Sequence, residues 1–360
     1  MKRFIGFERG MGMGGWLTNY KRFNVLPKEF RGITIGDLEH FRTYITEWDI
    51  DNIKKMGFDH IRLGFDQIVL EESPYQYREE IMRILENFVE SCLKKGINVV
   101  LNLHKAVGNY CDIKEEVSLF ESAELQNRVI ALWLELEKRF EKYPTVAFEL
   151  LNEVLDIEPN LWNDFAQKLI EEIRKKNKTR IIIVGPTAWN SSTKLKYLRV
   201  YDDENVVYTF HNYEPNEFTH QRGVLQFATL WYNRVLTYPC DDIERYRDYR
   251  RLHDIENPYP NYDRIDERFL ADSMQGAVDF IKEHPDKILW CGEFGTIRHI
   301  DIQSRINYMR DSIQFFKKHQ IPYSVWNYLS TPNDGNRFSL VDDDTREILS
   351  LDLLKALLGE

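Results

Sequence analysis

The chain has 360 residues, 29% of them charged and 43% hydrophobic, which is typical of a soluble globular protein with one large domain or two average ones. Its net charge of −10 argues against a nucleic-acid partner, whose phosphates require a basic surface. No stretch approaches the about 20 apolar residues of a membrane span, and Glu8 and Arg9 interrupt the basic start before any run of signal-peptide length.

Short apolar runs alternate with longer amphipathic segments along the whole chain. Eight runs have the continuous Val, Ile, Leu and Phe content of strands buried on both faces: residues 4–7, 58–65, 97–104, 146–152, 180–185, 205–213, 287–294 and 323–329. Helical patterns lie between and after them, at 47–57, 77–95, 123–143, 161–177, 191–199, 266–283, 302–319 and 346–358. Eight strands each followed by a helix predict a (β/α)8 TIM barrel, with residues 1–360 forming one domain.

A doubly wound α/β sheet is the rival architecture. Its nucleotide-binding form needs a glycine-rich turn between a strand and a helix. The only tempting segment is GMGMGG at residues 10–15, and it leads into Trp16 and Leu17 rather than into a helix start. The barrel is therefore the better prediction.

One segment, residues 214–264, interrupts the alternation after the sixth strand. It is far longer than an ordinary connection and is rich in Tyr and Arg. Because the loops after barrel strands lie at the catalytic face, we expect a small inserted subdomain there. Its aromatic residues either stack on a ligand or form the insert's own core, and the sequence favours neither: Trp231, Tyr232, Tyr238, Tyr246 and Tyr249.

The two most informative strand-like runs each end on a glutamate, Glu153 after VAFELLN and Glu293 after KILWCG. A carboxylate at the tip of a buried strand is costly unless it is paired or used. Two carboxylates that converge on one cleft are what acid-assisted glycoside hydrolysis requires. The 13% aromatic content also suits a groove that stacks on the apolar faces of sugar rings.

Other polar or aromatic residues fall near the predicted strand ends, where a barrel places its active site. Each has a structural alternative, since a single strand-end histidine is more often a structural hydrogen-bonding residue. Their regular recurrence favours a functional site. They are Arg62, His104, Asn152, His211, Tyr213 and Trp326, with Trp16 for the first strand.

These motifs occur in an order that resembles glycoside hydrolase family 5, also called cellulase family A, and in particular its bacterial endoglucanases of the CelC type. The matching segments span nearly the whole chain: GMGGWL (12–17), HIRLGF (60–65), LNLHKAVG (101–108), AFELLNEV (147–154), FHNY (210–213), CGEFG (291–295) and SVWNYL (324–329). The resemblance implies a catalytic barrel that carries its acid/base and its nucleophile on strands four and seven.

Position by position, the resemblance assigns Glu153 as proton donor and Glu293 as nucleophile. It assigns Asn152 to the sugar 2-hydroxyl and Arg62 to holding the nucleophile ionised, which suits a guanidinium because it never deprotonates. Tyr213 would hydrogen-bond the nucleophile.

The remaining matches concern substrate binding. The resemblance assigns His104 and His211 as active-site histidines, Trp326 as the platform under the −1 sugar and Trp16 as a subsite wall. Lys105 departs from the pattern, because many relatives have a second histidine there, and the Ala-Val-Gly after it replaces an Ala-Pro-Gly turn. This departure affects subsite contacts on the non-reducing side and leaves the catalytic pair unchanged.

The leading hypothesis is thus a retaining endo-β-1,4-glucanase that acts on cellulose-type or mixed-linkage β-glucan. A β-mannanase or an exo-β-glucosidase on the same barrel is the alternative, and a catalytically silent carbohydrate-binding barrel or a metal-dependent hydrolase fits less well. We expect no cofactor, no metal, no nucleic-acid or membrane partner, a monomer, and a cytoplasmic location unless a leader has been removed. The four cysteines have no zinc spacing and are expected to be free thiols.

Overall fold

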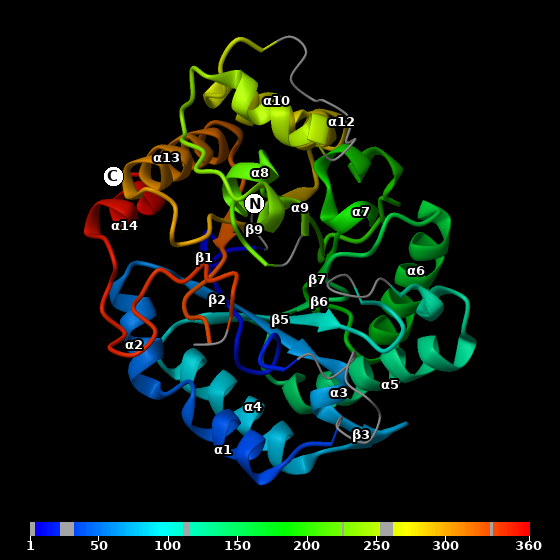
Figure 1. Ribbon diagram of the computed structural model, residues 1–360. Coiled ribbons are helices and arrows are strands. Elements are labelled where there is room, and N and C mark those ends of the chain that lie inside the picture. The colour runs from blue at the N-terminus through cyan, green and yellow to red at the C-terminus, as the bar shows by residue number, and fades with distance from the viewer. Residues whose placement is uncertain (1–3, 22–31, 111–115, 225–226, 253–261, 332–333) are drawn as a thin grey trace.

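The computed structural model describes residues 4–21, 32–110, 116–224, 227–252, 262–331 and 334–360. Within them, eight parallel strands close into a barrel in the order β1-β10-β9-β8-β7-β6-β5-β2, which confirms the predicted (β/α)8 fold (Figure 1). The strands are β1 (Arg9–Met13), β2 (His60–Asp66), β5 (Asn98–Lys105), β6 (Val146–Glu149), β7 (Ile182–Val184), β8 (Val206–Asn212), β9 (Ile288–Phe294) and β10 (Tyr323–Val325).

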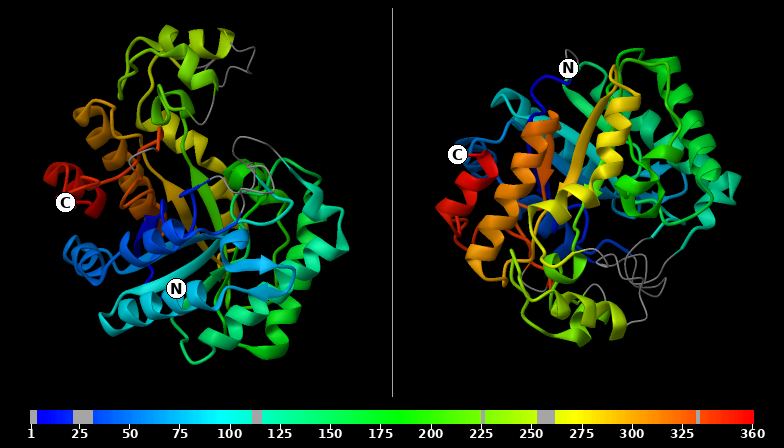
Figure 2. Two further views of the ribbon diagram at one scale, coloured as in Figure 1. Left: turned by 60° about the horizontal axis from the view of Figure 1, so that its bottom comes forward. Right: turned by 90° about the horizontal axis from the view of Figure 1, so that it is seen from above.

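Helices cover the outside of the barrel, as the ribbon views show (Figures 1 and 2). The longer ones are α1 (Ile35–Thr43), α2 (Glu47–Lys55), α4 (Glu79–Lys94), α5 (Ala123–Phe140), α6 (Pro159–Lys176), α11 (Glu267–Ser273), α12 (Gln275–Glu283), α13 (Ile302–His319) and α14 (Leu351–Leu358). In α5, which lies within the helix predicted at 123–143, the residues Val129, Leu132 and Leu136 form one buried face at helical spacing. Among the helices that the structure describes, none has the length and apolarity to cross a membrane.

The first predicted strand, residues 4–7, is wrong, because β1 begins at Arg9 in the glycine-rich segment. Phe4 and Phe7 are instead stacked on each other at a centroid distance of 4.6 Å. They are buried in a small second core cluster that includes Trp290 of β9. Glycine has a low strand propensity, so the sequence did not indicate β1. The barrel nevertheless requires glycine in this strand, because a larger residue would clash with a neighbouring side chain. A Cβ at Gly10 would lie 2.1 Å from the His60 ring.

Three predicted helices differ most from the structure. Residues 266–283 form two helices, α11 and α12, which meet at Met274. The segment 346–358 becomes helical only at Leu351, where Ser350 caps α14. Residues 191–199 contain only the 3-10 helix η3 (Ser192–Tyr197). Short elements that the sequence did not indicate are α3 (Gln67–Leu70), β3 (Glu71–Ser73), β4 (Gln76–Tyr77), η2 (Ser118–Phe120) and α7 (Thr187–Asn190).

The segment 214–264 contains α8 (Asn216–Thr219), α9 (Phe227–Tyr232) and α10 (Ile243–Leu252), and α10 lies at one end of the barrel (Figures 1 and 2). Residues 225–226 and 253–261 of this segment lie outside the described residues. Tyr238 is buried and its hydroxyl donates to Asp311 of α13 at 2.8 Å. Three further tyrosines of the segment are also buried, Tyr232, Tyr246 and Tyr249, whereas Tyr262 is partly buried.

Most of the aromatic side chains that the structure describes in 214–264 are therefore core, whereas Trp231 is 77% exposed. Whether the segment forms a separate subdomain stays a prediction. Three of the four cysteines are buried free thiols, Cys92, Cys240 and Cys291, and Cys111 lies outside the described residues.

Candidate active site

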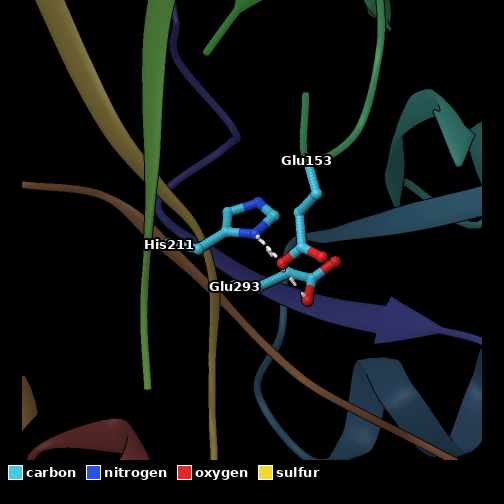
Figure 3. Close-up of side chains that lie close together, drawn as sticks. All are labelled: Glu153, His211 and Glu293. Atoms are coloured by element: carbon cyan, nitrogen blue, oxygen red, sulfur yellow. Dashed lines mark hydrogen bonds and ion pairs between the residues drawn. The ribbon is translucent and has the colours of Figure 1, made fainter. Parts of the chain in front are cut away.

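The two predicted glutamates lie together at the carboxyl ends of the strands. Glu293 belongs to β9. Glu153 lies in the turn that follows β6. The backbone N–H of Asn152 holds this turn against β5 by donating to the Leu103 carbonyl at 2.9 Å. Figure 3 shows their carboxylates side by side, with the ring of His211 from β8 next to them. One oxygen of each carboxylate and one nitrogen of His211 all lie within 4.8 Å of one another.

Arg62 of β2 links the two strand ends through a fully buried guanidinium. Its Nε and Nη2 donate to the two oxygens of Glu149 at 2.6 and 2.8 Å, and its Nη1 donates to Glu293 Oε1. Burial alone would lower the pKa of Arg62, but the charges of Glu149 and Glu293 outweigh it and raise the pKa above its usual value. Arg62 is therefore a permanent cation beside Glu293.

The sequence reasoning missed Glu149, the second carboxylate of this network. The residue lies at the end of β6 and is completely buried. A charge in a buried strand requires a buried counter-charge. The same argument that drew attention to Glu153 and Glu293 therefore applied to Glu149 within AFELLNE.

Asn152 completes the Arg62 network, since its Oδ1 accepts from Arg62 Nη2 at 2.8 Å. Its Nδ2 is buried and has no hydrogen-bond partner among the described residues. An amide donor left without a partner in a site costs free energy unless a ligand accepts from it.

Tyr213, which follows β8, donates its hydroxyl to Glu293 Oε2 at 2.8 Å. Burial, reinforced by the charge of Glu293, raises the pKa of Tyr213 well above its ordinary value, so the hydroxyl keeps its proton. Glu293 thus receives one hydrogen bond from a cation and one from a phenol.

His211 contacts the other glutamate. Its Nδ1 lies 2.9 Å from Glu153 Oε1 and 3.9 Å from Glu293 Oε2. Burial lowers the pKa of His211 to about 4, with the charge of Glu293 opposing this in part. The imidazole is therefore neutral near neutral pH.

His104, in β5, and Trp326, which directly follows β10, lie at the same carboxyl ends of the strands. The His104 ring stacks on the Trp326 indole at a centroid distance of 5.4 Å and an interplanar angle of 12°. Its Nδ1 lies 2.9 Å from Asn102 Oδ1, and burial lowers its pKa well below the ordinary value. Trp326 is partly exposed, and Gly12 and Gly14 leave room for its ring.

Trp16 is buried in the protein core, which corrects its prediction as a subsite wall. It is 1% exposed, its Nε1 donates to the Phe41 carbonyl at 2.8 Å, and its ring packs edge-on against Phe88. The indole nitrogen is thus hydrogen-bonded inside the protein, and the ring is buried. Lys105 is buried at the end of β5, in register with Asp66 of β2.

Glu153, His211 and Glu293 also have the donor types and spacing of a small metal site. However, Arg62 already supplies a positive charge to Glu293, and Tyr213 occupies its second oxygen. Protein groups thus satisfy Glu293, and the expectation that no metal is needed stays a prediction.

Comparison with known proteins agrees with this geometry. The family model described as cellulase (glycosyl hydrolase family 5) matches residues 20–331. The chain belongs to glycosyl hydrolase family 5. It is a glycoside hydrolase, and the family resemblance inferred from its motifs is confirmed.

Two curated relatives cover most of the chain. Endoglucanase C of Acetivibrio thermocellus is 32% identical over 336 residues, which is 90% of this chain and 92% of that protein. Cellodextrinase A of Ruminococcus flavefaciens is 28% identical over 326 residues, 89% of this chain and 85% of that protein. The crystal structure of endoglucanase Cel5A from Thermotoga maritima superposes with a TM-score of 0.75 at 24% identity, covering 99% of this chain and 98% of that one, which supports the barrel fold.

Proposed function

We propose that this family 5 enzyme is a retaining endo-β-1,4-glucanase with Glu293 as nucleophile and Glu153 as acid/base. The observation that carries the proposal is the closeness of the two carboxylates, whose oxygens approach within 4.8 Å. Retaining glycosidases hold their carboxyl groups about 5–5.5 Å apart, whereas inverting enzymes need about 6.5–9.5 Å to admit a water molecule.

The assignment of the two roles follows from the asymmetry of their partners. Arg62 and Tyr213 stabilise a negative charge on Glu293, as a nucleophile requires. Glu153 instead contacts His211, which is uncharged near neutral pH. A carboxyl group beside a neutral partner and near the negative charge of Glu293 is the better candidate to hold a proton.

The reaction then proceeds in two displacements. Glu293 attacks the anomeric carbon while Glu153 gives its proton to the leaving oxygen, so a covalent glycosyl-enzyme forms and the glycosidic bond breaks. Glu153 next takes a proton from water, which attacks the anomeric carbon and releases Glu293. Arg62 and Tyr213 take up the charge that returns to Glu293.

The sugar at the cleavage site is held by groups without another role in this scheme. The unpartnered Nδ2 of Asn152 is available to the 2-hydroxyl group. The partly exposed ring of Trp326 offers a platform for a sugar face. The names of endoglucanase C and cellodextrinase A, both similar over most of the chain, favour β-1,4-linked glucose polymers or oligomers.

Proton NMR during early hydrolysis of a β-1,4-glucan oligosaccharide tests the stereochemistry. We expect the β anomer of the new reducing end to appear first, and initial accumulation of the α anomer would refute the retaining mechanism. Chromatography of products from carboxymethyl-cellulose, mixed-linkage glucan, mannan and aryl cellobioside tests the substrate. Internal cleavage of both glucans supports the proposal, whereas faster turnover of mannan or release of single glucose units alone would contradict it.

A further inference from the structure

The buried Asn190 contacts His211 on the side of the imidazole ring opposite Glu153. Asn190 is the last residue of α7, is completely buried, and places its Nδ2 3.1 Å from His211 Nε2. The other ring nitrogen, Nδ1, is the one that lies 2.9 Å from Glu153 Oε1. Asn190, His211 and Glu153 therefore form a continuous chain of hydrogen bonds from the end of α7 to the catalytic carboxylates.

The backbone around Asn190 is specialised for holding this amide. Ala188, Trp189 and Asn190 have consecutive φ values of 55°, 55° and 57°, in the left-handed region that side chains other than glycine rarely adopt. Ser191 then forms a parallel bridge to His211 itself. The turn thereby brings the amide to the imidazole from an adjoining strand end.

The amide is confined on its other side by Gly185. A Cβ at Gly185 would lie 2.5 Å from Asn190 Oδ1 and 2.8 Å from its Nδ2, so the amide packs flat on the glycine backbone. Asn190 Oδ1 is buried and has no hydrogen-bond partner among the described residues. His211 is thus the polar group toward which the amide is directed.

The hydrogen-bond roles along this chain follow from proton counting. Amide Nδ2 can only donate, so Nε2 of His211 must accept and cannot carry a proton. In a neutral imidazole the single proton is then on Nδ1, which donates to Glu153 Oε1. Because Oε1 is occupied as an acceptor, a proton on Glu153 belongs on its other oxygen, Oε2.

We propose that Asn190 is a positioning residue for catalysis, because it fixes His211 with its proton on Nδ1 and so directs the transferable proton of Glu153 to Oε2. The inference rests on the proposed role of Glu153 as acid/base. It assigns no chemistry to Asn190 itself, which acts only through the histidine.

Two variants test the role of the amide without straining the turn. Asn190→Asp keeps the shape and tolerates the left-handed backbone, but its carboxylate, when ionised, can only accept, so Nε2 must then carry a proton. Asn190→Gly removes the amide and adopts a positive φ without cost. Ser192→Ala is the matched control, since its hydroxyl anchors the same turn by donating to the Ser273 carbonyl at 2.9 Å.

The first readout is the 15N NMR spectrum of histidine-labelled protein, with His211 assigned from a His211→Gln variant. We expect a protonated Nδ1 and a bare Nε2 in the unaltered protein and in Ser192→Ala, and a protonated Nε2 in Asn190→Asp. A proton on Nε2 in the unaltered protein, or an unchanged His211 spectrum in Asn190→Asp, would overturn the proposal. This readout does not depend on which glutamate is the acid.

The second readout is kcat/KM on aryl β-cellobiosides, which reports the step that needs the acid. We expect Asn190→Asp to lower it about 10- to 100-fold for a phenyl leaving group and less than about threefold for dinitrophenyl, which needs little protonation. Asn190→Gly should show the same dependence with a smaller loss, and Ser192→Ala should show none. Equal losses on both substrates would make Asn190 merely structural. Full polymer activity in Glu153→Gln would instead refute the proposed function while leaving the tautomer result intact.

Discussion

Two completely buried arginines of this barrel use the same chemistry for different ends. Arg180, which precedes β7, donates to Glu137 of α5 at 2.7 and 3.1 Å and to three backbone carbonyls: Phe140, Tyr143 and Val146. Arg62 donates to Glu149 and Asn152, and its Nη1 donates to Glu293, whose side chain keeps 7% of its surface exposed.

The difference lies in whether a carboxylate of the network is left within reach of a ligand. Around Arg180, all donors and both oxygens of Glu137 are taken up by protein groups at the amino ends of the strands. Around Arg62, Glu149 neutralises the guanidinium while Glu293 is held at the carboxyl ends. Barrels concentrate stability at the first end and chemistry at the second. The Arg180 network, in which protein groups occupy every donor and acceptor (the closed network), stabilises the fold. The Arg62 network, in which Glu293 stays partly exposed (the open network), prepares a reactive group.

The largest effect that we predict comes from breaking the closed network of Arg180 and Glu137. Glu137→Gln leaves Arg180 as a buried cation without a carboxylate, which should lower the free energy of unfolding by about 3–5 kcal/mol. Urea unfolding at pH 7 measures it. The folded variant should keep the parental kcat on a β-glucan, and a loss of kcat at unchanged stability would erase the contrast between the two networks.

The matched change in the open network is Glu149→Gln. It removes the bidentate anchor of Arg62, whose bonds to Glu149 measure 2.6 and 2.8 Å, so the guanidinium should shift relative to Glu293. We expect kcat to fall about 100-fold, the size of effect that a displacement of about 1 Å produces. Steady-state kinetics of the folded variant measures it, with Glu137→Gln as control. Equal kcat values for the two variants would show that the Arg62 network is also only structural.

Buried histidines make the stability of the catalytic end of the barrel depend on pH, whereas the ion pair of Arg180 and Glu137 contains no histidine. Burial lowers the pKa of His220, which packs on Tyr213 and Phe338, to about 4. The unfolded chain binds a proton at this residue below its ordinary value of 6.5, and the folded chain does so only near 4. Stability from this residue is therefore fully present above pH 6.5 and is lost as the pH falls toward 4.

The corresponding variant is His220→Phe, which keeps an aromatic ring and removes the titrating group. Between pH 7 and pH 5 the parent should lose about 2 kcal/mol more unfolding free energy than this variant. Urea unfolding at both pH values measures the difference. An identical pH dependence in the two proteins would show that His220 takes up its proton in the folded state.

The sequence was sufficient to predict the barrel and the convergence of Glu153, Glu293, Arg62 and Tyr213, because strand-end polar residues meet wherever parallel strands close. It was insufficient for β1, since glycine has low strand propensity and only the packing of His60 and Trp326 explains its presence. Trp16 was wrongly assigned to the substrate site, because an indole ring packs equally well against a sugar and in a protein core.

Nothing in the sequence indicated that Asn190 contacts an active-site residue. Its position depends on a left-handed turn and on the space above Gly185, neither of which has a periodic pattern. The aromatic residues of 214–264 were ambiguous for a related reason, since only three-dimensional contacts distinguish the buried Tyr238 from the exposed Trp231.

The smallest effect concerns that exposed indole on α9. We expect Trp231→Ala to raise KM for carboxymethyl-cellulose about fivefold, equivalent to about 1 kcal/mol, because an exposed indole can stack on the sugar rings of a polymer. The same change should leave an aryl cellobioside unaffected. Initial-rate kinetics on both substrates measures it. Trp48→Ala, which removes a 51% exposed indole on the barrel helix α2, is the control. Equal changes on both substrates would place Trp231 outside substrate binding.

The central claim, that the open Arg62 network holds the nucleophile, is tested most directly by trapping the glycosyl-enzyme. A 2-deoxy-2-fluoro-β-cellobioside with a good leaving group should form an intermediate that is hydrolysed slowly, and mass spectrometry of protease digests locates the attached sugar. The account predicts one label, on Glu293. A label on Glu153, or rapid turnover with inversion and no label at all, would contradict it.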